Sequence, residues 1–184
     1  MFDEIRQTFG RLDVCINNAG LSHNSPLLTG KPSEWRNTLD VNVMALCICT
    51  QLAVKLMQEK GIDDGQIIHI SSIGGHRIGT VGEHGLHFYC ASKFMVRALT
   101  DGLRGELKAL KSNIRIASLS PGIVQTEILN TYLKDDPIRK PSDLYGAMKA
   151  LQPEDIADTV IHILSAPPHV EVHDVILRPY EQPN

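Results

Sequence analysis

The sequence predicts an α/β fold with a parallel sheet, and three observations favour it. Short apolar runs alternate with longer helical segments along the 184 residues, an order typical of parallel strands joined by right-handed crossovers. Apolar residues make up 42% of the chain and charged residues 21%, which suits a packed core and argues against disorder. Polar residues and glycine follow the apolar runs, where ligands bind in such sheets. We expect one domain over residues 1–184.

The expected elements begin with a helix, a strand and a second, long helix. Apolar side chains at helical spacing end at Gly10, so the first ten residues are expected to close a helix. Residues 12–16 are a short apolar run that enters a turn over residues 17–20, which predicts a strand. Ser33 has the residue type of an N-cap for a helix over 34–60. Its middle is apolar nearly all round, so it should bury two faces, one on the sheet and one on another element such as a second subunit.

The second half of the chain continues the alternation. A helix over 88–110 carries one apolar stripe, and a later helix has Pro153 at its first position. The remaining expected elements are a strand over 67–71, a Gly-rich loop over 72–87, a strand over 114–119, a mixed polar segment over 123–148 and a strand over 173–177.

Charge and composition exclude several classes of function. Lys and Arg number 18 and Asp and Glu 21, for a formal net charge of −3, so no basic excess is available to bind nucleic acid. No apolar run reaches the roughly 18 residues of a membrane span, and the N-terminus does not have the form of a secretory signal. Four cysteines without a C-x-x-C pair fit reduced thiols in the cytoplasm. His84 and His87 have no further ligands nearby in sequence, so we expect no metal.

The pair Tyr89 and Lys93 carries the strongest chemical signal. Residues i and i+4 lie on one helix face, about 5–6 Å apart at Cβ, so the ammonium group can approach the phenol. A positive charge favours phenolate and lowers a pKa that is ordinarily near 10, which suits a general acid–base. Ser72, just past a strand end, can hydrogen-bond the same substrate oxygen. Alone, such a pair is more often only solvated.

The pair is part of a longer set of motifs, which come in a fixed order along the chain. In combination, the set resembles the short-chain dehydrogenase/reductase family, in its single-domain branch, over nearly the whole sequence. The resemblance implies a doubly wound, Rossmann-type sheet and an NADP-linked, reversible alcohol/carbonyl conversion, with NAD not excluded. The motifs are Asn17-Asn18-Ala19-Gly20, Asn42, Ile70-Ser71-Ser72, Tyr89-x-x-x-Lys93 and Pro121-Gly122-x-Val124-x-Thr126.

The resemblance also implies a role for each motif residue. Tyr89 would be the general acid–base, and Lys93 would lower its pKa and hold the nicotinamide ribose. Ser72 would orient the substrate oxygen, so that Ser72 and Tyr89 both contact substrate, and Asn42 would hold a water in a proton relay. From the residues alone, Asn42 could equally be bonded to a backbone carbonyl, and Gly20 and Gly122 could be turn residues only. The implied cofactor contacts are Asn18, Ala19, Gly20, Tyr89, Lys93, Pro121, Gly122, Val124, Gln125 and Thr126.

The sequence departs from the family at the phosphate-binding turn. No G-x-G-x-x-G occurs in it, and that turn normally seats the pyrophosphate. We therefore expect a partial doubly wound sheet, with the first three strands, on the order of 75 residues, missing. The strand over 12–16 would then be an open edge, beside an exposed apolar face.

The expected function is that of an NADP-dependent oxidoreductase acting on a hydrophobic alcohol and its ketone or aldehyde, such as a steroid or an isoprenoid like farnesol. Leu129, Tyr132 and Leu133 would supply an apolar wall. Helices 34–60 and 88–110 would form a homodimer or tetramer, as in the family. The alternative is a catalytically silent, truncated subunit that acts only through a full-length partner. An epimerase or dehydratase of the larger branch is disfavoured, because few residues follow Thr126.

Overall fold

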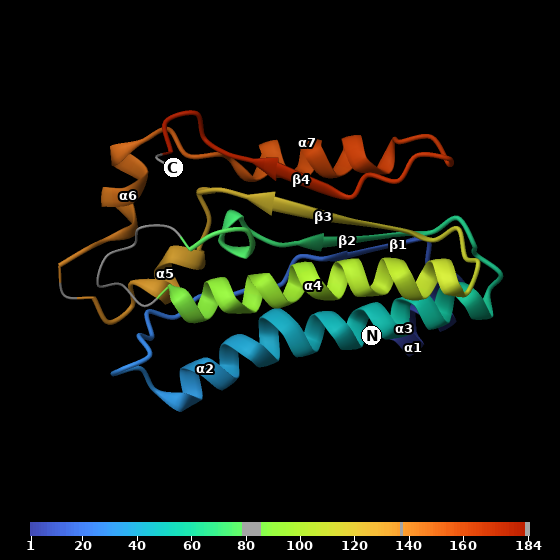
Figure 1. Ribbon diagram of the computed structural model, residues 1–184, viewed down its shortest axis with the longest axis horizontal. Helices are drawn as coiled ribbons and strands as arrows, with labels where there is room; N and C mark the ends of the chain where they lie inside the picture. The colour runs from blue at the N-terminus through green and yellow to red at the C-terminus, as the bar shows by residue number, and fades with distance from the viewer. Residues whose placement is uncertain (79–85, 137, 183–184) are drawn as a thin grey trace.

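A single parallel sheet of four strands organises the structure, a computed structural model that describes residues 1–78, 86–136 and 138–182. Its strands are β1 (Val14–Asn17), β2 (Gln66–Ile70), β3 (Arg115–Pro121) and β4 (Asp174–Leu177), which lie side by side in chain order (Figure 1). All three pairings are parallel. The predicted α/β class and parallel sheet are therefore confirmed, and each strand lies within two residues of its expected position.

The helices also follow the predicted order. The long helix begins at Pro32 with Lys31 as its N-cap, so the expectation of Ser33 as the cap is wrong. Proline at the first helical position has its backbone angle preset for the helix, and that preference fixes the start. The helices are α1 (Phe2–Thr8), α2 (Pro32–Leu39), the π-helix η1 (Asp40–Ala45), α3 (Leu46–Glu59), the 3₁₀-helix η2 (Ile73–Gly75), α4 (His87–Ala109), α5 (Ile128–Tyr132), α6 (Pro141–Ala147) and α7 (Pro153–Leu164).

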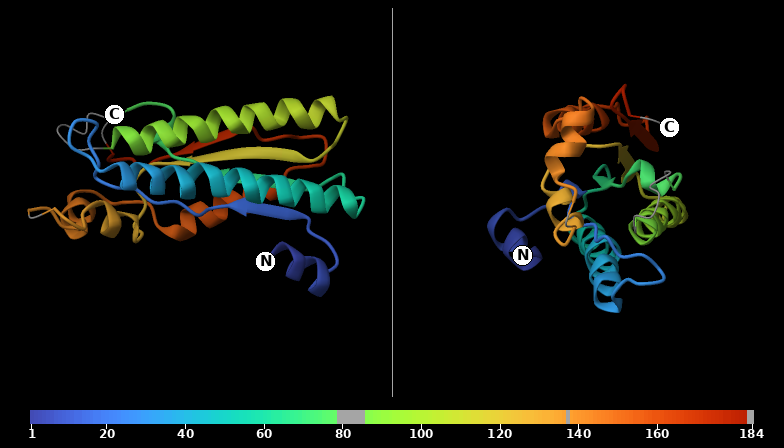
Figure 2. Two further views of the ribbon diagram at one scale, coloured as in Figure 1. Left: turned by 90° about the horizontal axis from the view of Figure 1, so that it is seen from below. Right: turned by 90° about the vertical axis from the view of Figure 1, so that its left-hand side faces the viewer.

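Alternate residues of the strands face two separate apolar layers. Ile67 on β2 packs with Met57 on α3 and with residues of α4 on one side of the sheet. Its neighbour Ile68 packs with Val160 and Ile163 of α7 on the other side. Val160 and Ile163 thus form the inward face of the helix that starts at Pro153. Figure 2 shows the resulting three layers, with α3 and α4 on one face and α7 on the opposite face.

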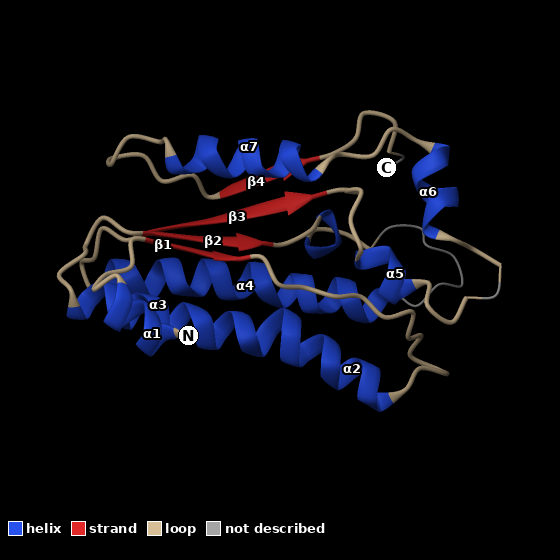
Figure 3. Cartoon of the chain, turned by 180° about the vertical axis from the view of Figure 1, so that it is seen from behind, coloured by secondary structure: helices blue, strands red, loops and turns tan. Residues whose placement is uncertain are grey.

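The third crossover has the opposite hand to the first two. Because the strands lie in the order β1-β2-β3-β4, each crossover leads from one strand to its neighbour in the same direction across the sheet. The helices of the first two crossovers lie on one face, whereas α7, in the crossover from β3 to β4, lies on the other. The three connections therefore cannot share a hand, and the expectation of uniformly right-handed crossovers is wrong. The long segment that contains α5 and α6 carries the chain over the edge of the sheet first (Figure 3).

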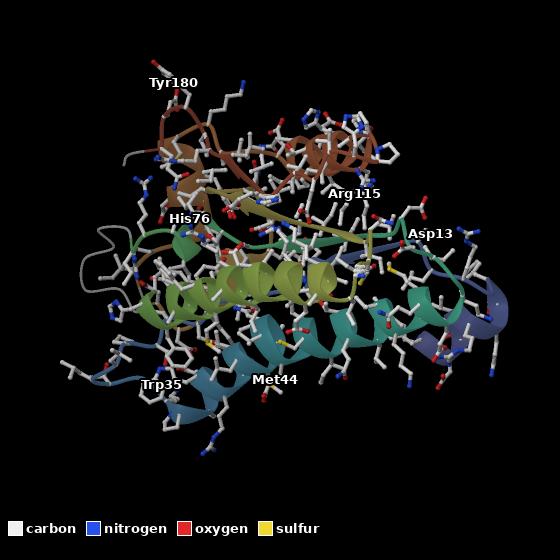
Figure 4. The ribbon with its side chains drawn as sticks, turned by 45° about the vertical axis from the view of Figure 1, so that its right-hand side comes forward. Asp13, Trp35, Met44, His76, Arg115 and Tyr180 are labelled. Atoms are coloured by element: carbon white, nitrogen blue, oxygen red, sulfur yellow. The ribbon has the colours of Figure 1, made fainter. Side chains whose placement is uncertain are left out.

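Helices α2, η1 and α3 form one continuous rod over Pro32–Glu59. By length and composition alone this rod could cross a membrane, but the core helices of folded proteins pass the same test, so this weak signal does not overturn the expectation of no membrane span. Ala53 and Met57 on its inner face are fully buried against the sheet. On its outer face Met44 and Ile48 are about half exposed, and Figure 4 shows Met44 pointing away from the molecule. Within this chain, only one of the two expected faces is therefore buried.

Strand β1 forms one edge of the sheet, as expected for residues 12–16. Val14 and Ile16 on it are 36% and 43% exposed. The other face of the strand contacts the core through Cys15. An apolar strand with an open edge is a site where another chain can add a strand.

Candidate active site

The four residues expected to be catalytic come from three neighbouring elements at the carboxyl ends of the strands. Tyr89 and Lys93 lie in the first two turns of α4, Ser72 follows β2, and Asn42 lies in η1. Figure 1 shows the first turn of α4 at the end of the molecule toward which the strands point. This is the edge where ligands bind in parallel α/β sheets.

Lys93 is buried and fixed by the end of strand β2. Its side chain is only 4% exposed, and its Nζ donates a hydrogen bond of 2.9 Å to the Ile70 carbonyl. The Nζ lies 5.8 Å from the centre of the Tyr89 ring. The helical spacing of Tyr89 and Lys93 thus places them together, as the sequence predicts. Among the described residues the ammonium donates this one hydrogen bond, which leaves two of its three N–H groups for other partners.

Ser72 meets the phenol of Tyr89. The Ser72 Oγ begins helix η2 by accepting a hydrogen bond of 3.0 Å from the Gly74 amide, and the Ser72 side chain also hydrogen-bonds Tyr89. Gly74 packs closely against Ser72 and against Cys90, the neighbour of Tyr89. A Cβ at Gly74 would lie 3.1 Å from Cys90 Sγ and 3.4 Å from Ser72 Oγ. The hydroxyls of Ser72 and Tyr89 therefore lie next to each other.

The pKa values of the pair differ from the sequence expectation. Burial raises the pKa of Tyr89 to about 12, and the hydrogen bond to Ser72 opposes that rise. Burial lowers the pKa of Lys93 to about 8. The expectation that Lys93 lowers the pKa of Tyr89 is therefore wrong in this structure. The ammonium group is held by the Ile70 carbonyl, and desolvation of the phenol dominates.

Asn42 fastens the turn after β1 to the rest of the site. Its side chain is 1% exposed, and its amide pairs with both backbone groups of Leu21 at 2.9 Å. The Asn42 Nδ2 also donates to Ser92 Oγ at 3.1 Å. The bond to a backbone carbonyl that the sequence left open as a structural role is thus present. A π-helical turn, which often marks a functional site, positions this amide.

The turn residues Asn18, Ala19 and Gly20 are exposed beside this cluster. A Cβ at Gly20 would lie 3.6 Å from both Asn42 Oδ1 and Lys93 Nζ. The absence of a side chain at Gly20 therefore leaves space against the buried ammonium. This space and the two remaining N–H donors of Lys93 fit the vicinal hydroxyls of a ribose.

The loop Pro121–Thr126 lies at the carboxyl end of β3, and distant parts of the chain hold it. Within the described residues, its hydrogen bonds lead to the carboxyl-terminal third of the chain and not to Tyr89 or Lys93. The Tyr145 hydroxyl donates to the Thr126 carbonyl at 2.8 Å, while Gln125 and Thr126 are exposed. The sequence did not identify Tyr145 or Gln182 as partners, because no local pattern links residues so far apart. The backbone partners are Leu177 O for Gly122 N, Leu151 N for Ile123 O and Leu151 O for Gln125 N, and Gln182 Oε1 accepts from Ile123 N.

A chain of side-chain hydrogen bonds crosses the core behind the site. Thr100 donates to the Val96 carbonyl at 2.8 Å, so it must accept from His69 Nδ1, also at 2.8 Å. The other nitrogen of His69 then accepts from Thr50 at 3.1 Å, and Thr50 accepts from Asn17 at 2.9 Å. Burial, with a smaller effect from Lys93, lowers the pKa of His69 to about 4. The chain thus joins β1, α3, β2 and α4 through a neutral imidazole.

The segment after β3 borders a pocket that lies apart from the catalytic candidates. A pocket of about 470 Å³ lies between residues 23–34 and residues 131–136, and polar side chains line most of it. Of Leu129, Tyr132 and Leu133, only Tyr132 lines this pocket, and Leu133 is 5% exposed. Since Ser72, Tyr89 and Lys93 do not line this pocket, an apolar wall at the active site stays a prediction.

Within the described residues, neither a disulfide nor a metal centre contributes to the site. All four cysteines are free thiols. Across residues 1–78, 86–136 and 138–182, no three His, Cys, Asp or Glu side chains are grouped closely enough to hold a metal ion. His84 lies outside the described residues.

Comparison with known proteins adds independent findings. Residues 1–137 match a family model described as short chain dehydrogenase. The chain is 46% identical over 182 residues to dehydrogenase/reductase SDR family member 11 from Bos taurus, covering 99% of this chain and 70% of that protein. It is 37% identical over 180 residues to farnesol dehydrogenase from Aedes aegypti, covering 97% of this chain and 68% of that protein.

Comparison with solved structures also finds dehydrogenases. The closed form of a serine dehydrogenase complexed with NADP+ has a TM-score of 0.84 at 28% identity, covering 100% of this chain and 73% of that chain. A 4-hydroxyisoleucine dehydrogenase complexed with NADH has a TM-score of 0.75 at 25% identity, covering 97% and 72%. Since a family model matches most of the sequence and relatives align with nearly all of it, the chain belongs to the short-chain dehydrogenase/reductase family.

Proposed function

We propose that the chain is an NADP-dependent oxidoreductase that interconverts a hydrophobic alcohol and its ketone or aldehyde. The observation that carries the proposal is the meeting of Ser72 and Tyr89 beside the buried Lys93. The NADP+ complex of the serine dehydrogenase supports the cofactor, and the NADH complex of the second neighbour keeps NAD open. Likeness to farnesol dehydrogenase supports a hydrophobic substrate. The comparisons do not support a catalytically silent subunit.

Residues of this chain fit the nicotinamide end of a dinucleotide. Lys93 would hold the ribose hydroxyls in the space that Gly20 leaves free. Asn18 and Ala19 would lie along the same side, with Tyr89 behind the ribose, and the loop Pro121–Thr126, including Gly122, Val124 and Gln125, would contact the nicotinamide and phosphate end. No glycine-rich pyrophosphate turn is among the residues of this sequence. When bound, the nicotinamide supplies the hydride acceptor or donor.

The protein's own residues would move the proton. In the reducing direction, Tyr89 would donate its hydroxyl proton to the substrate oxygen while Ser72 donates a hydrogen bond to the same atom. With a pKa of about 12, Tyr89 carries that proton at neutral pH. In the oxidising direction, the phenolate would take the proton from the alcohol. Asn42 would hold a water that links Lys93 to solvent, in addition to fixing Leu21.

Replacement of one oxygen tests this mechanism. Tyr89→Phe removes the proton donor but keeps the ring against Gly74, so we expect the rate of NADP-linked farnesol or hydroxysteroid oxidation to fall by about 10²–10⁴-fold. Tyr180→Phe, at a fully exposed tyrosine, is the matched control. Retention of activity by Tyr89→Phe contradicts the mechanism. A preference for serine over farnesol contradicts the hydrophobic substrate but not the mechanism.

We further propose that two copies associate through helices 34–60 and 88–110, in a homodimer or tetramer. The outer faces of α3 and α4 carry Ile48, Leu52, Phe94 and Met95, each more than one-third exposed. Contiguous apolar surface of this kind marks an interface. A cytoplasmic location remains a prediction from the reduced cysteines, all four of which are free. Sedimentation of the purified chain tests the association directly.

A further inference from the structure

The carboxyl-terminal tail forms a compact turn after β4. The Gln182 amide donates to the Pro179 carbonyl at 3.2 Å, and the Arg178 guanidinium donates to the Gln182 carbonyl at 2.7 Å. Tyr180, at the tip, is fully exposed, and Figure 4 shows it pointing away from the molecule. The turn therefore directs the side chain of Gln182 back toward the sheet.

Gln182 binds the loop that follows β3. Its Oε1 accepts a hydrogen bond of 3.0 Å from the Ile123 amide, 59 residues away in sequence. This amide donates at a partly buried position, where an unpaired N–H destabilises the folded state. The side chain of Gln182 thus gives the Ile123 amide the hydrogen-bond acceptor that the backbone of a neighbouring strand provides elsewhere in the sheet.

Gly122 has no room for a side chain, because the tail lies against it. Its φ is not positive, since Gly10 and Gly61 are the described glycines with positive φ. A Cβ at Gly122 would instead overlap Gln182 Oε1 and lie 3.0 Å from Pro179 Cδ. Glycine at this position therefore permits close approach. Loop and tail fit each other, and a change in one displaces the other.

The same tail also holds the segment that pairs with the loop from its other side. Glu181 Oε2 accepts from the Lys149 amide at 2.9 Å. Two residues later, Leu151 forms a parallel bridge with Val124 and accepts from the Gln125 amide at 2.8 Å. The loop is thus enclosed between two segments, and the tail contacts both.

We propose that Gln182 is a positioning residue that orients the loop Pro121–Thr126 for dinucleotide binding. The inference rests on the proposed function, which assigns this loop to the cofactor. Gln182 touches neither substrate nor the reacting atoms; it acts through the Ile123 amide. A loop with this amide bonded presents Val124, Gln125 and Thr126 in one fixed arrangement, and a loop without it samples several.

Three substitutions separate the hydrogen bond from the bulk of the side chain. Gln182→Met keeps the length but removes the acceptor, and we expect the Kd for NADP to rise about five- to tenfold, the loss typical of one backbone hydrogen bond, with kcat changed less than twofold. Gln182→Glu keeps an acceptor oxygen and should bind nearly as the unsubstituted chain does. Tyr180→Ala, in the same tail, is the control and should change neither value.

A measurement without cofactor reports on the bond itself. In Gln182→Met, amide hydrogen exchange at Ile123, followed by NMR, should accelerate about tenfold or more, while exchange at core strand β2 stays unchanged. Gly122→Ala should break the same hydrogen bond through a change in the loop, because the added Cβ would displace the Gln182 side chain from the Ile123 amide. The double variant should therefore be little worse than either single one. This second route keeps the inference testable if Gln182→Met is poorly folded.

Different outcomes overturn different claims. Unchanged NADP affinity in Gln182→Met, or equal loss in Gln182→Glu, contradicts the role of Gln182 even if Ile123 exchange accelerates. Weaker binding in Gln182→Met, together with full activity in Tyr89→Phe, refutes the proposed mechanism and leaves the inference standing. Failure of the unsubstituted chain to bind either NADP or NAD overturns both.

Discussion

Acidification should destabilise the fold through His69, the buried imidazole between Thr50 and Thr100. Its pKa is about 4 in the folded chain, against 6.5 for the ordinary group. Between these values the unfolded chain binds a proton that the folded chain does not, so stability rises with pH in this window. The full contribution is present above pH 6.5 and is lost as the pH falls toward 4.

The difference of 2.5 pKa units corresponds to about 3 kcal/mol at most. Linkage between pH 7 and pH 5 gives a loss of about 2 kcal/mol, most of it below pH 6.5. The structure supports a cost for protonation at Nε2, because the Thr50 hydroxyl, which also accepts from Asn17, would have to turn its proton away from the ring and would lose Nε2 as its acceptor. His69 is 1% exposed, so water cannot relieve the conflict.

Urea unfolding at pH 7 and pH 5 checks this value. The unsubstituted chain should lose about 2 kcal/mol more than His69→Gln, which cannot titrate. His162→Gln, at an exposed histidine on α7, is the matched control substitution. Equal losses in the unsubstituted chain and in His69→Gln would refute the burial argument.

Three further outcomes follow from the geometry. The rate of alcohol oxidation should rise steadily from pH 7 to pH 10, because the phenolate of Tyr89 becomes more populated as the pH approaches its pKa of about 12; a plateau below pH 9 in a pH–rate profile would contradict this. Asn42→Ala should lower the free energy of unfolding by about 2–3 kcal/mol, because it leaves both backbone groups of Leu21 unpaired. An unchanged urea midpoint would argue against a stabilising role for the two Asn42–Leu21 hydrogen bonds. Ile48→Asp should convert the proposed oligomer to monomer in sedimentation, whereas Ile161→Asp, at a somewhat more exposed site on α7, should not.

Much of the fold could be predicted because its signals are local. The spacing of Tyr89 and Lys93 on one helix requires only helical geometry, and the alternation of apolar runs with helices fixes a parallel sheet. These features survive in the structure within one or two residues of where the sequence places them.

The remaining features depend on contacts between distant residues. No pattern near Ile123 indicates that Gln182 will accept from its amide. The direction of the Tyr89 pKa depends on how deeply the phenol is buried and on where Lys93 turns its ammonium, and neither is written in a five-residue motif. Likewise, the side of the sheet that α7 covers is decided by the path of the chain through α5 and α6.

The π-helix in the long rod has a consequence for how sequence changes are tolerated. A π-turn holds one residue more than an α-turn would, so the angular phase of the side chains differs before and after it. The amide of Asn42 can therefore hydrogen-bond to Leu21 while Ala53 and Met57, farther along the rod, still face the strands. If the same residues were wound as an uninterrupted α-helix, the side chains before and after this turn would be rotated relative to one another by about 100°, and the two tasks would fall on conflicting sides of the helix.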